Sequence, residues 1–145
     1  MADYKGIKGF NVQSLATDPL ATGVAGATWS SGGAMNTART DPGGTGIQTA
    51  ALATGGNDGS TPRAITEIYN GSSWTEVNDL NTARFGVAAD GTTTASVAFG
   101  GATSPPTNVN NTELWNGSAW TEVNNLNTAR RLLNGAGVST SALAF

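Results

Sequence analysis

Residues 65–84 read ITEIYNGSSWTEVNDLNTAR, and residues 111–130 repeat them with few changes as NTELWNGSAWTEVNNLNTAR. A fainter copy begins at Trp29 and ends in the same Asn-Thr-Ala-Arg sequence. A period of this length is typical of arrays in which each copy forms one supersecondary unit. The period therefore indicates the fold class before any single residue is considered. Two markers recur in all three copies at intervals of 45 and 46 residues: Trp29, Trp74 and Trp120, and Arg39, Arg84 and Arg130.

Each full copy contains four short runs of β-type residues separated by turn residues, and none is long enough for an ordinary helix. We therefore expect an all-β protein. An Asn-Gly pair connects the third run to the fourth in both units, which predicts hairpins with a type I′ turn, positive φ at both central residues. The expected strands are 46–48, 49–54, 64–69 and 73–77 in the first full unit, and 86–89, 95–99, 112–115 and 119–123 in the second.

The longer connections, 57–62 and 102–107, are rich in turn residues and differ between the two units. Such segments are surface loops, and surface loops commonly carry binding residues. Asn57 and Asp58 have oxygen atoms of the kind that calcium prefers, but the second loop has no acidic residue, so we expect a plain turn and no metal site. The candidate binding residues are Asn57, Asp58, Ser60, Thr103, Ser104 and Asn108.

Composition excludes several classes of function. Charged residues make up 12% of the 145 residues, and the net charge is −3 without a cluster of Lys or Arg. These values argue against a nucleic-acid surface, and no apolar run of about 18 residues predicts a membrane span. The chain has no Cys and no His, so disulfides, thiol catalysis, the usual zinc sites and histidine-dependent triads are excluded. No cofactor is expected.

Residues 1–20 stand outside the repeat and contain both lysines of the chain. They have no apolar stretch of the kind found in secretory signals, so we expect cytoplasmic synthesis without a signal peptide. The sequence thus divides into an N-terminal arm, residues 1–20, and a repeat segment, residues 21–145. The residues that we expect to mediate attachment through the arm are Tyr4, Lys5, Ile7, Lys8 and Phe10.

The unit of four strands over about 45 residues resembles the kelch repeat. The features that carry the resemblance are a double glycine after the second strand, an aromatic residue in the third, a tryptophan in the fourth and the arginine that follows. It implies four-stranded antiparallel blades of a β-propeller. The glycine pairs are Gly55 and Gly56 in the first unit and Gly100 and Gly101 in the second, and the third-strand aromatic residues are Tyr69 and Trp115.

The phase of the repeat predicts that one chain does not finish the ring. The chain reads as a last strand, two full blades and the first two strands of another blade, with residues 21–25 as a degenerate third strand. That makes about three blades, whereas closed propellers have about four to eight. We therefore expect a homo-oligomer, in the simplest case a dimer with six blades, in which the N-terminal strands of one copy complete the blade begun at the C-terminus of the other. Pairing of the two ends within one chain, or blades supplied by another partner, are the alternatives.

The repeated side chains are expected to be structural. The resemblance implies that Trp74 and Trp120 pack between neighbouring blades against the glycines, and we expect this packing rather than stacking on a ligand because large aromatic residues dominate core burial. The three arginines and the repeated Glu67 and Glu113 suit bonds from Arg to Glu or to backbone that fix one blade on the next. A catalytic carboxylate pair needs two unlike environments, and copied residues have like environments. We therefore expect no catalytic residues.

The sequence thus favours a noncatalytic structural or recognition module that presents loops to a protein or a glycan. The alternative is a small propeller enzyme, a lyase or hydrolase of glycans. The arm sequence YKGIKGF at residues 4–10, followed by Asp18-Pro19, resembles the kelch-type virion proteins of tailed marine bacteriophages. This resemblance implies location in the virion as a tail fibre or surface appendage. It also implies an arm that binds other virion proteins and a propeller that faces a glycan or protein of the host surface.

Overall fold

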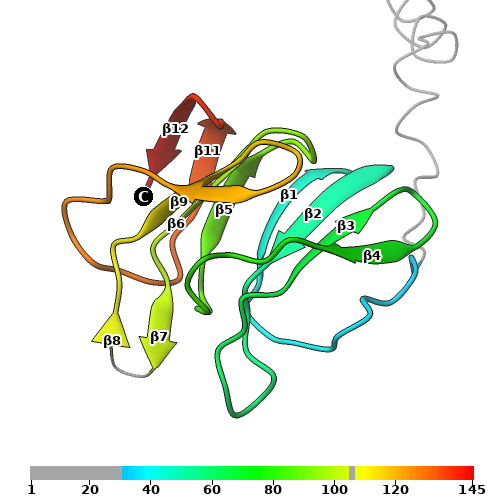
Figure 1. Ribbon diagram of the computed structural model, residues 1–145, viewed down its shortest axis with the longest axis horizontal. Coiled ribbons are helices and arrows are strands. Elements are labelled where there is room, and N and C mark those ends of the chain that lie inside the picture. The colour runs from blue at the N-terminus through cyan, green and yellow to red at the C-terminus, as the bar shows by residue number, and fades with distance from the viewer. Residues whose placement is uncertain (1–30, 105–106) are drawn as a thin grey trace, which may run out of the picture. The chain divides into compact units, whose positions relative to one another are not determined.

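The computed structural model of the protein describes residues 31–104 and 107–145. The expected arm at residues 1–20, the degenerate strand at residues 21–25, and Trp29 lie outside the described residues. Within them every regular element is a β-strand and all strand pairs are antiparallel, so the prediction of an all-β fold is confirmed. Figure 1 shows the strands grouped into two larger sheets and two short hairpins.

The first sheet contains β1 (Gly43–Ile47), β2 (Ala50–Thr54), β3 (Thr66–Tyr69) and β4 (Trp74–Val77), paired in this order. The four expected strands are present, but β1 begins at Gly43 rather than at residue 46. Its turn to β2 also lies at residues 48–49, where the second strand was expected to begin. Three of the first four residues of β1 are glycines, which have low β-propensity, and pairing with β2 overrides that preference.

The second sheet has the order β10-β9-β6-β5 and repeats the first. Its strands are β5 (Ala88–Gly91), β6 (Ser96–Phe99), β9 (Thr112–Trp115) and β10 (Trp120–Glu122). The connection from β6 to β9, expected to be a loop, contains a short hairpin, β7 (Ala102–Ser104) and β8 (Thr107–Asn108). A last hairpin, β11 (Gly135–Val138) and β12 (Ser141–Ala144), lies where the phase of the repeat predicts the first two strands of a further unit.

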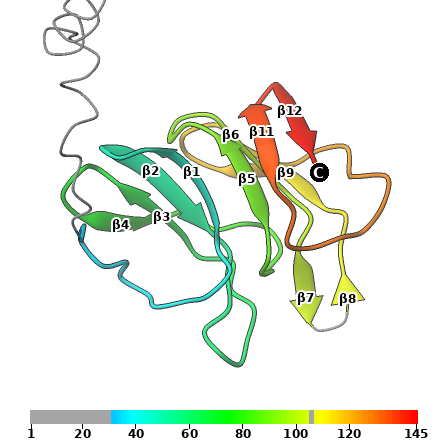
Figure 2. The same ribbon diagram turned by 180° about the vertical axis from the view of Figure 1, so that it is seen from behind.

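The first strands of the successive units lie side by side. β5 packs next to β1 on one side and next to β11 on the other, as Figure 1 and Figure 2 show from opposite sides. The described strands therefore form a row of sheets in the order of the sequence. They do not close into a ring within the residues that the structure describes.

The two predicted hairpins, β3–β4 and β9–β10, are confirmed, but the predicted turn type is wrong. Tyr69 pairs with Trp74, so the loop has four residues, and of the Asn-Gly pair only Gly71 has positive φ, at 92°. The Asn70 Oδ1 atom accepts hydrogen bonds from the backbone N–H groups of Ser72 and Ser73, both at 3.0 Å. This is an Asx-type turn, in which the side chain replaces a backbone acceptor. Residues 116–119 form the same turn in the second unit.

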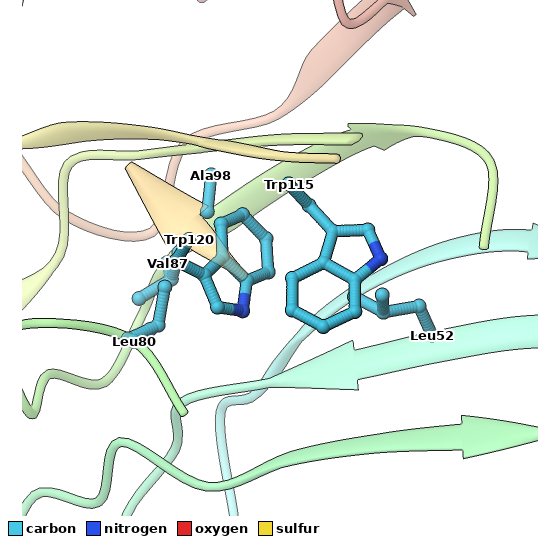
Figure 3. Packing of buried hydrophobic residues seen from close by; sticks show 6 residues of the cluster. All are labelled: Leu52, Leu80, Val87, Ala98, Trp115 and Trp120. Carbon is cyan, nitrogen blue, oxygen red and sulfur yellow. The ribbon is translucent and has the colours of Figure 1, made fainter. Parts of the chain in front are cut away.

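Two hydrophobic clusters hold the sheets together, one at each junction. The first lies between the two four-stranded sheets and is drawn in Figure 3; its buried residues are Leu52, Leu80, Val87, Ala98, Trp115 and Trp120. The second lies between the second sheet and the β11–β12 hairpin; its buried residues are Ala88, Val97 and Phe99, with Leu114, Leu126, Leu133 and Ala144 partly buried around them. The core is thus itself repeated, once per junction.

Candidate functional site

Two buried ion pairs repeat one arrangement, the first where the segment before β1 meets the first sheet and the second at the junction between the two four-stranded sheets. Arg84, on the segment that follows β4, contacts Glu113 of β9 with 2.8 Å between Nη1 and Oε1, and both side chains are 1% exposed or less. Arg39 and Glu67 of β3 form the same pair one repeat earlier, also fully buried. Arg84 further donates to the Ala98 carbonyl at 3.4 Å. Each arginine thus ties the segment that enters a sheet to the third strand of that sheet.

Backbone and side-chain N–H groups donate further hydrogen bonds to the carboxylate oxygens of Glu67 and Glu113. The Asn81 backbone N–H and side-chain amide both donate to Glu113 Oε2 at 2.8 Å, and the Asn36 N–H donates to Glu67 Oε2 at 2.7 Å. Burial alone raises the pKa of Glu67, but the hydrogen bonds from Arg39 and Asn36 outweigh burial and hold the pKa below its ordinary value. A carboxylate kept ionised in this way anchors the junction and is a poor proton donor.

Arg130 occupies the third position of the series and differs from the other two. Its side chain is exposed, and among the described residues no carboxylate lies within ion-pair distance of it. Its backbone carbonyl accepts a hydrogen bond from the Gly101 N–H at 2.9 Å, as the Arg84 carbonyl does from the Gly56 N–H. Arg130 is therefore held in the repeated backbone arrangement without the partner that Arg84 has.

The two fourth-strand tryptophans of the described residues, Trp74 and Trp120, also differ, in burial and in the acceptor of their indole N–H. Trp120 is 5% exposed, and its Nε1–H donates to Thr66 Oγ1 of the first sheet at 3.1 Å. Trp74 is half-buried, and its Nε1–H donates to the Gly33 carbonyl at 2.9 Å. Each stacks on the third-strand aromatic residue of its own hairpin, with ring centroids 5.2 to 5.4 Å apart.

The glycine pairs allow the arginine-bearing segments to approach, rather than the tryptophan rings as we expected. A Cβ atom at Gly55 would lie 2.6 Å from the Arg84 carbonyl oxygen, and one at Gly100 would lie 2.6 Å from the Arg130 carbonyl oxygen. All four glycines of the two pairs have positive φ, which disfavours other residues. The pairs Gly55–Gly56 and Gly100–Gly101 therefore allow the arginine-bearing segments to pack closely against the backbone that follows β2 and β6.

The first candidate binding loop is organised by its own side chains. Asp58 Oδ1 accepts hydrogen bonds from the backbone N–H groups of Ser60 and Thr61 at 3.0 and 2.9 Å, and Oδ2 accepts from Arg63. These bonds, the backbone ones foremost, hold the pKa of Asp58 well below its ordinary value. Asn57 Oδ1 is likewise used, by the Gly59 N–H at 2.7 Å. The oxygens that we considered for calcium are thus engaged within the loop.

The second candidate loop is the β7–β8 hairpin, with Ser104 and Asn108 exposed and Thr103 half-buried. Figure 1 and Figure 2 both show that this hairpin and the β2–β3 connection, which carries Asn57, Asp58 and Ser60, extend from the same end of the two sheets. We call this end the loop end. The structure thus places at one end of the sheets candidate residues that lie one repeat apart in the sequence.

Asp90 on β5 is a polar residue that the sequence analysis missed. Its Oδ2 atom is buried without a hydrogen-bond partner among the described residues, and burial raises the pKa of this carboxyl group. It lines a cavity of about 300 Å³ between β1, β5 and the start of β11. The signal was present in the sequence: Asp90 precedes Gly91, whereas Thr45 and Ala136 precede the equivalent Gly46 and Gly137.

Thr112, at the start of β9, is the second such residue. It is 8% exposed, and its Oγ1 atom also lacks a hydrogen-bond partner among the described residues. No signal in the sequence singles it out, because Thr66 stands at the same position of the preceding repeat. Only the packing of the junctions distinguishes the two threonines.

No protein-family model matches the chain, and no curated protein matches its sequence. The resemblances to kelch repeats and to phage virion proteins therefore stay predictions. In the described ranges, no three or more Asp and Glu residues gather as a group that could hold a metal ion. The same ranges contain no helix long and apolar enough to cross a membrane.

Proposed function

We propose that this protein is a noncatalytic structural and recognition module whose sheets are kelch-type blades of a β-propeller. The observation that carries the proposal is the loop end, where two loops of different sequence extend from the same end of sheets whose third and fourth strands are nearly identical in sequence. The scaffold is copied, and the loops vary. This division is typical of proteins that hold variable binding loops on a rigid framework.

The row of first strands supports the propeller architecture. In a propeller the blades are arranged radially around a central channel. β1, β5 and β11 lie next to one another in this manner. In the described residues β12 pairs with β11 alone, which leaves one edge of the hairpin open, and open edges are normally covered or paired. A second copy of the chain completes the ring in this proposal, to give six blades.

The location proposed for the module is the virion of a tailed bacteriophage, as part of a tail fibre or surface appendage. This part of the proposal rests on the sequence resemblance of the arm. The arm binds other virion proteins, and the loop end faces a glycan or protein of the host surface.

A glycan array together with a cell-binding assay tests the recognition role. We expect the protein to bind a limited set of glycans or host cells, and a variant with Ser60→Asp and Ser104→Asp at the loop end to lose this binding with an unchanged melting temperature. The control is Thr75→Asp on the exposed face of β4, away from the loop end, which retains binding. Absence of any binder, or equal binding by the loop variant, would contradict recognition through this end.

One observation favours the alternative, a glycan lyase or hydrolase. Asp90, whose Oδ2 atom is buried, has a raised pKa, which is a property of general acids in glycoside hydrolysis. Release of reducing sugar by the protein and its loss in an Asp90→Asn variant would support the alternative over the noncatalytic role.

A further inference from the structure

An open apolar groove lies between the second sheet and the β11–β12 hairpin. Its volume is about 250 Å³, larger than the cavity of about 150 Å³ that accommodates benzene in a well-studied protein interior. The side chains come from β6, β9, β12 and the segment after β10. Those that the argument uses are Val97, Phe99, Thr112, Leu114, Val123 and Leu126.

The same surface of the first sheet is filled. Leu52 and Leu80 stand one repeat before Val97 and Leu126, and they are only 1% and 4% exposed. Trp115 and Trp120 of the second sheet cover them, as Figure 3 shows. Val97 is also buried, at 5% exposed, but Leu126 is only partly buried and lines the open groove. The groove is therefore the counterpart of a site that receives a tryptophan at the preceding junction.

The hydrogen-bonding groups indicate the same occupant. At the filled junction, Thr66 Oγ1 accepts a hydrogen bond from the Trp120 indole N–H at 3.1 Å and lies 2.8 Å from Thr54 Oγ1. At the groove, Phe99 replaces Thr54, and Thr112 Oγ1 is buried without a partner in the described residues. A buried hydroxyl without a partner is costly, and an indole N–H at the place of Trp120 would satisfy it.

Arg130, the arginine beside the groove, also lacks a carboxylate partner among the described residues. Beside the groove lies a smaller cavity of about 170 Å³, lined in part by Asn127 and Arg130. The equivalent Asn81 and Arg84 contact the carboxylate of Glu113. At the junction between the second sheet and the β11–β12 hairpin, both the tryptophan site and the carboxylate site are thus open among the described residues.

We propose that the groove binds the indole of Trp29 from a second copy of this chain. Trp29 precedes Arg39 by ten residues, as Trp74 precedes Arg84 and Trp120 precedes Arg130. The repeat therefore assigns Trp29 to the fourth strand of a blade, the strand that carries Trp120 at the filled junction. This inference rests on the proposed completion of the ring by a second copy and identifies the contact that brings the copies together.

The contacts between the segment before β1 and the first sheet indicate that the Trp29 in the groove comes from a second copy of the chain rather than from the same chain. Asn36 contacts Glu67 and the Trp74 carbonyl as Asn81 contacts Glu113 and the Trp120 carbonyl. The segment before β1 thus enters the first sheet as the segment after β4 enters the second. By this equivalence the repeat assigns Trp29 to a unit that precedes the first sheet in the sequence, whereas the groove follows the second sheet. A Trp29 that filled the groove of its own chain would require a closed ring of three blades, fewer than propellers have, so we assign the contact to a second copy.

A double-mutant cycle on the full chain tests the contact. Trp29→Phe keeps an aromatic side chain but removes the indole N–H donor, and Thr112→Val removes the hydroxyl acceptor. Self-association is measured by sedimentation equilibrium, and folding of each variant by circular dichroism. We expect a dimer that each substitution weakens by about tenfold, with no further loss in the double variant, because both remove the same hydrogen bond. Thr75→Ala, on the exposed face of β4, is the control and leaves association unchanged.

The outcomes separate this contact from the proposed assembly. Self-association that neither substitution weakens, or losses that simply add, would overturn the Trp29 contact while the completed ring stands. A monomer would overturn both the second copy as occupant and the proposed ring. Substitutions at the loop end are absent from this experiment, so its result is independent of ligand binding.

A cross-linking experiment covers the case in which these variants fold poorly. The chain contains no cysteine, so a disulfide reports only on introduced residues. A Trp29→Cys chain mixed with a tagged Leu114→Cys chain should form a mixed disulfide under mild oxidation, whereas a Trp29→Cys chain mixed with a Thr75→Cys chain should not. Equal cross-linking in both mixtures, or none in the first, would contradict the assignment.

A gain of association is expected from the opposite change. In the alignment without gaps, Thr22 stands where Glu67 and Glu113 stand in the full repeats, so this segment brings no carboxylate to Arg130. Thr22→Glu supplies one and should strengthen dimerisation in low salt by about threefold or more, and Arg130→Ala should abolish the gain. An equal gain in the presence of Arg130→Ala would show that the introduced carboxylate acts elsewhere and would count against the proposed contact.

Discussion

At the scale of single residues, the positions that differ between the units are as informative as those that recur. Some copied positions, such as Glu67 and Glu113, have equivalent partners in both units and serve the same purpose. A position at which the residue differs between the units has different neighbours and a different effect on the structure. Asp90 is the clearest of them, since its carboxyl group is buried where Thr45 and Ala136 stand in the neighbouring units.

Asp90→Asn is expected to change how stability depends on pH. Burial raises the pKa of Asp90 in the folded state above the value of about 3.9 in the unfolded chain. The folded state therefore prefers the protonated form of Asp90, and the contribution of this group to the free energy of unfolding is greatest at low pH and falls as pH rises through its folded-state pKa. The Asn variant lacks this fall. Urea unfolding from pH 3 to pH 8 should show the variant more stable than the wild type at neutral pH, with the difference vanishing at the acid end.

Both proteins share every other carboxylate, so the difference between the two profiles isolates Asp90. Parallel profiles would mean that Asp90 finds a partner or water in solution. Loss of stability in the variant at every pH would indicate that the carboxylate is held in its charged form.

At the scale of the elements, the junctions rather than the sheets define the molecule. Each sheet is small, with strands of three to five residues, and its apolar surface is buried only by the next sheet. Repeat proteins gain their stability in this way, from interfaces between neighbouring units. The buried ion pairs and the glycine pairs both lie at these interfaces, where the segment that leaves one sheet packs on the next.

Glu113→Ala is expected to weaken the junction between the two four-stranded sheets strongly. It leaves the buried Arg84 guanidinium without a counter-charge, which typically costs about 3–5 kcal/mol of the free energy of unfolding. Chemical denaturation followed by tryptophan fluorescence measures the loss. The control is Glu76→Ala on the exposed face of β4, expected to change stability by about 0.5 kcal/mol or less. Equal effects of the two substitutions would contradict the structural role of the buried pair.

At the scale of the whole molecule, the repeat and the arm are expected to act separately. The proposed ring uses residues from 21 onward, and the proposed attachment to the particle uses residues 1–20. Deletion of residues 1–20 should therefore leave the number of chains per oligomer unchanged in light scattering but abolish incorporation into particles, observed by electron microscopy. A deletion that leaves incorporation intact contradicts the anchor role, and one that dissociates the oligomer shows that the arm takes part in the ring.

Much of the fold was predictable because it depends on local patterns. The period, the four strands per unit and the two hairpins follow from alternating apolar residues and from turn residues at fixed positions. The errors concern details that local pattern does not determine. Glycines 43, 44 and 46 lie in β1 because β2 supplies a pairing partner, and the four-residue turns arise because the Asn70 and Asn116 side chains accept the hydrogen bonds.

The sequence by itself determined the all-β class, the length of the unit and the residues at its recurrent positions, because these are properties of short segments and of their repetition. Only the tertiary structure decided which of the recurrent contacts between units are made. Thr66 and Thr112 are the same residue at the same position, yet one accepts the Trp120 indole and the other faces an open groove. The physical reason is that a junction is formed by two units, and whether the second is present is a property of the assembled molecule.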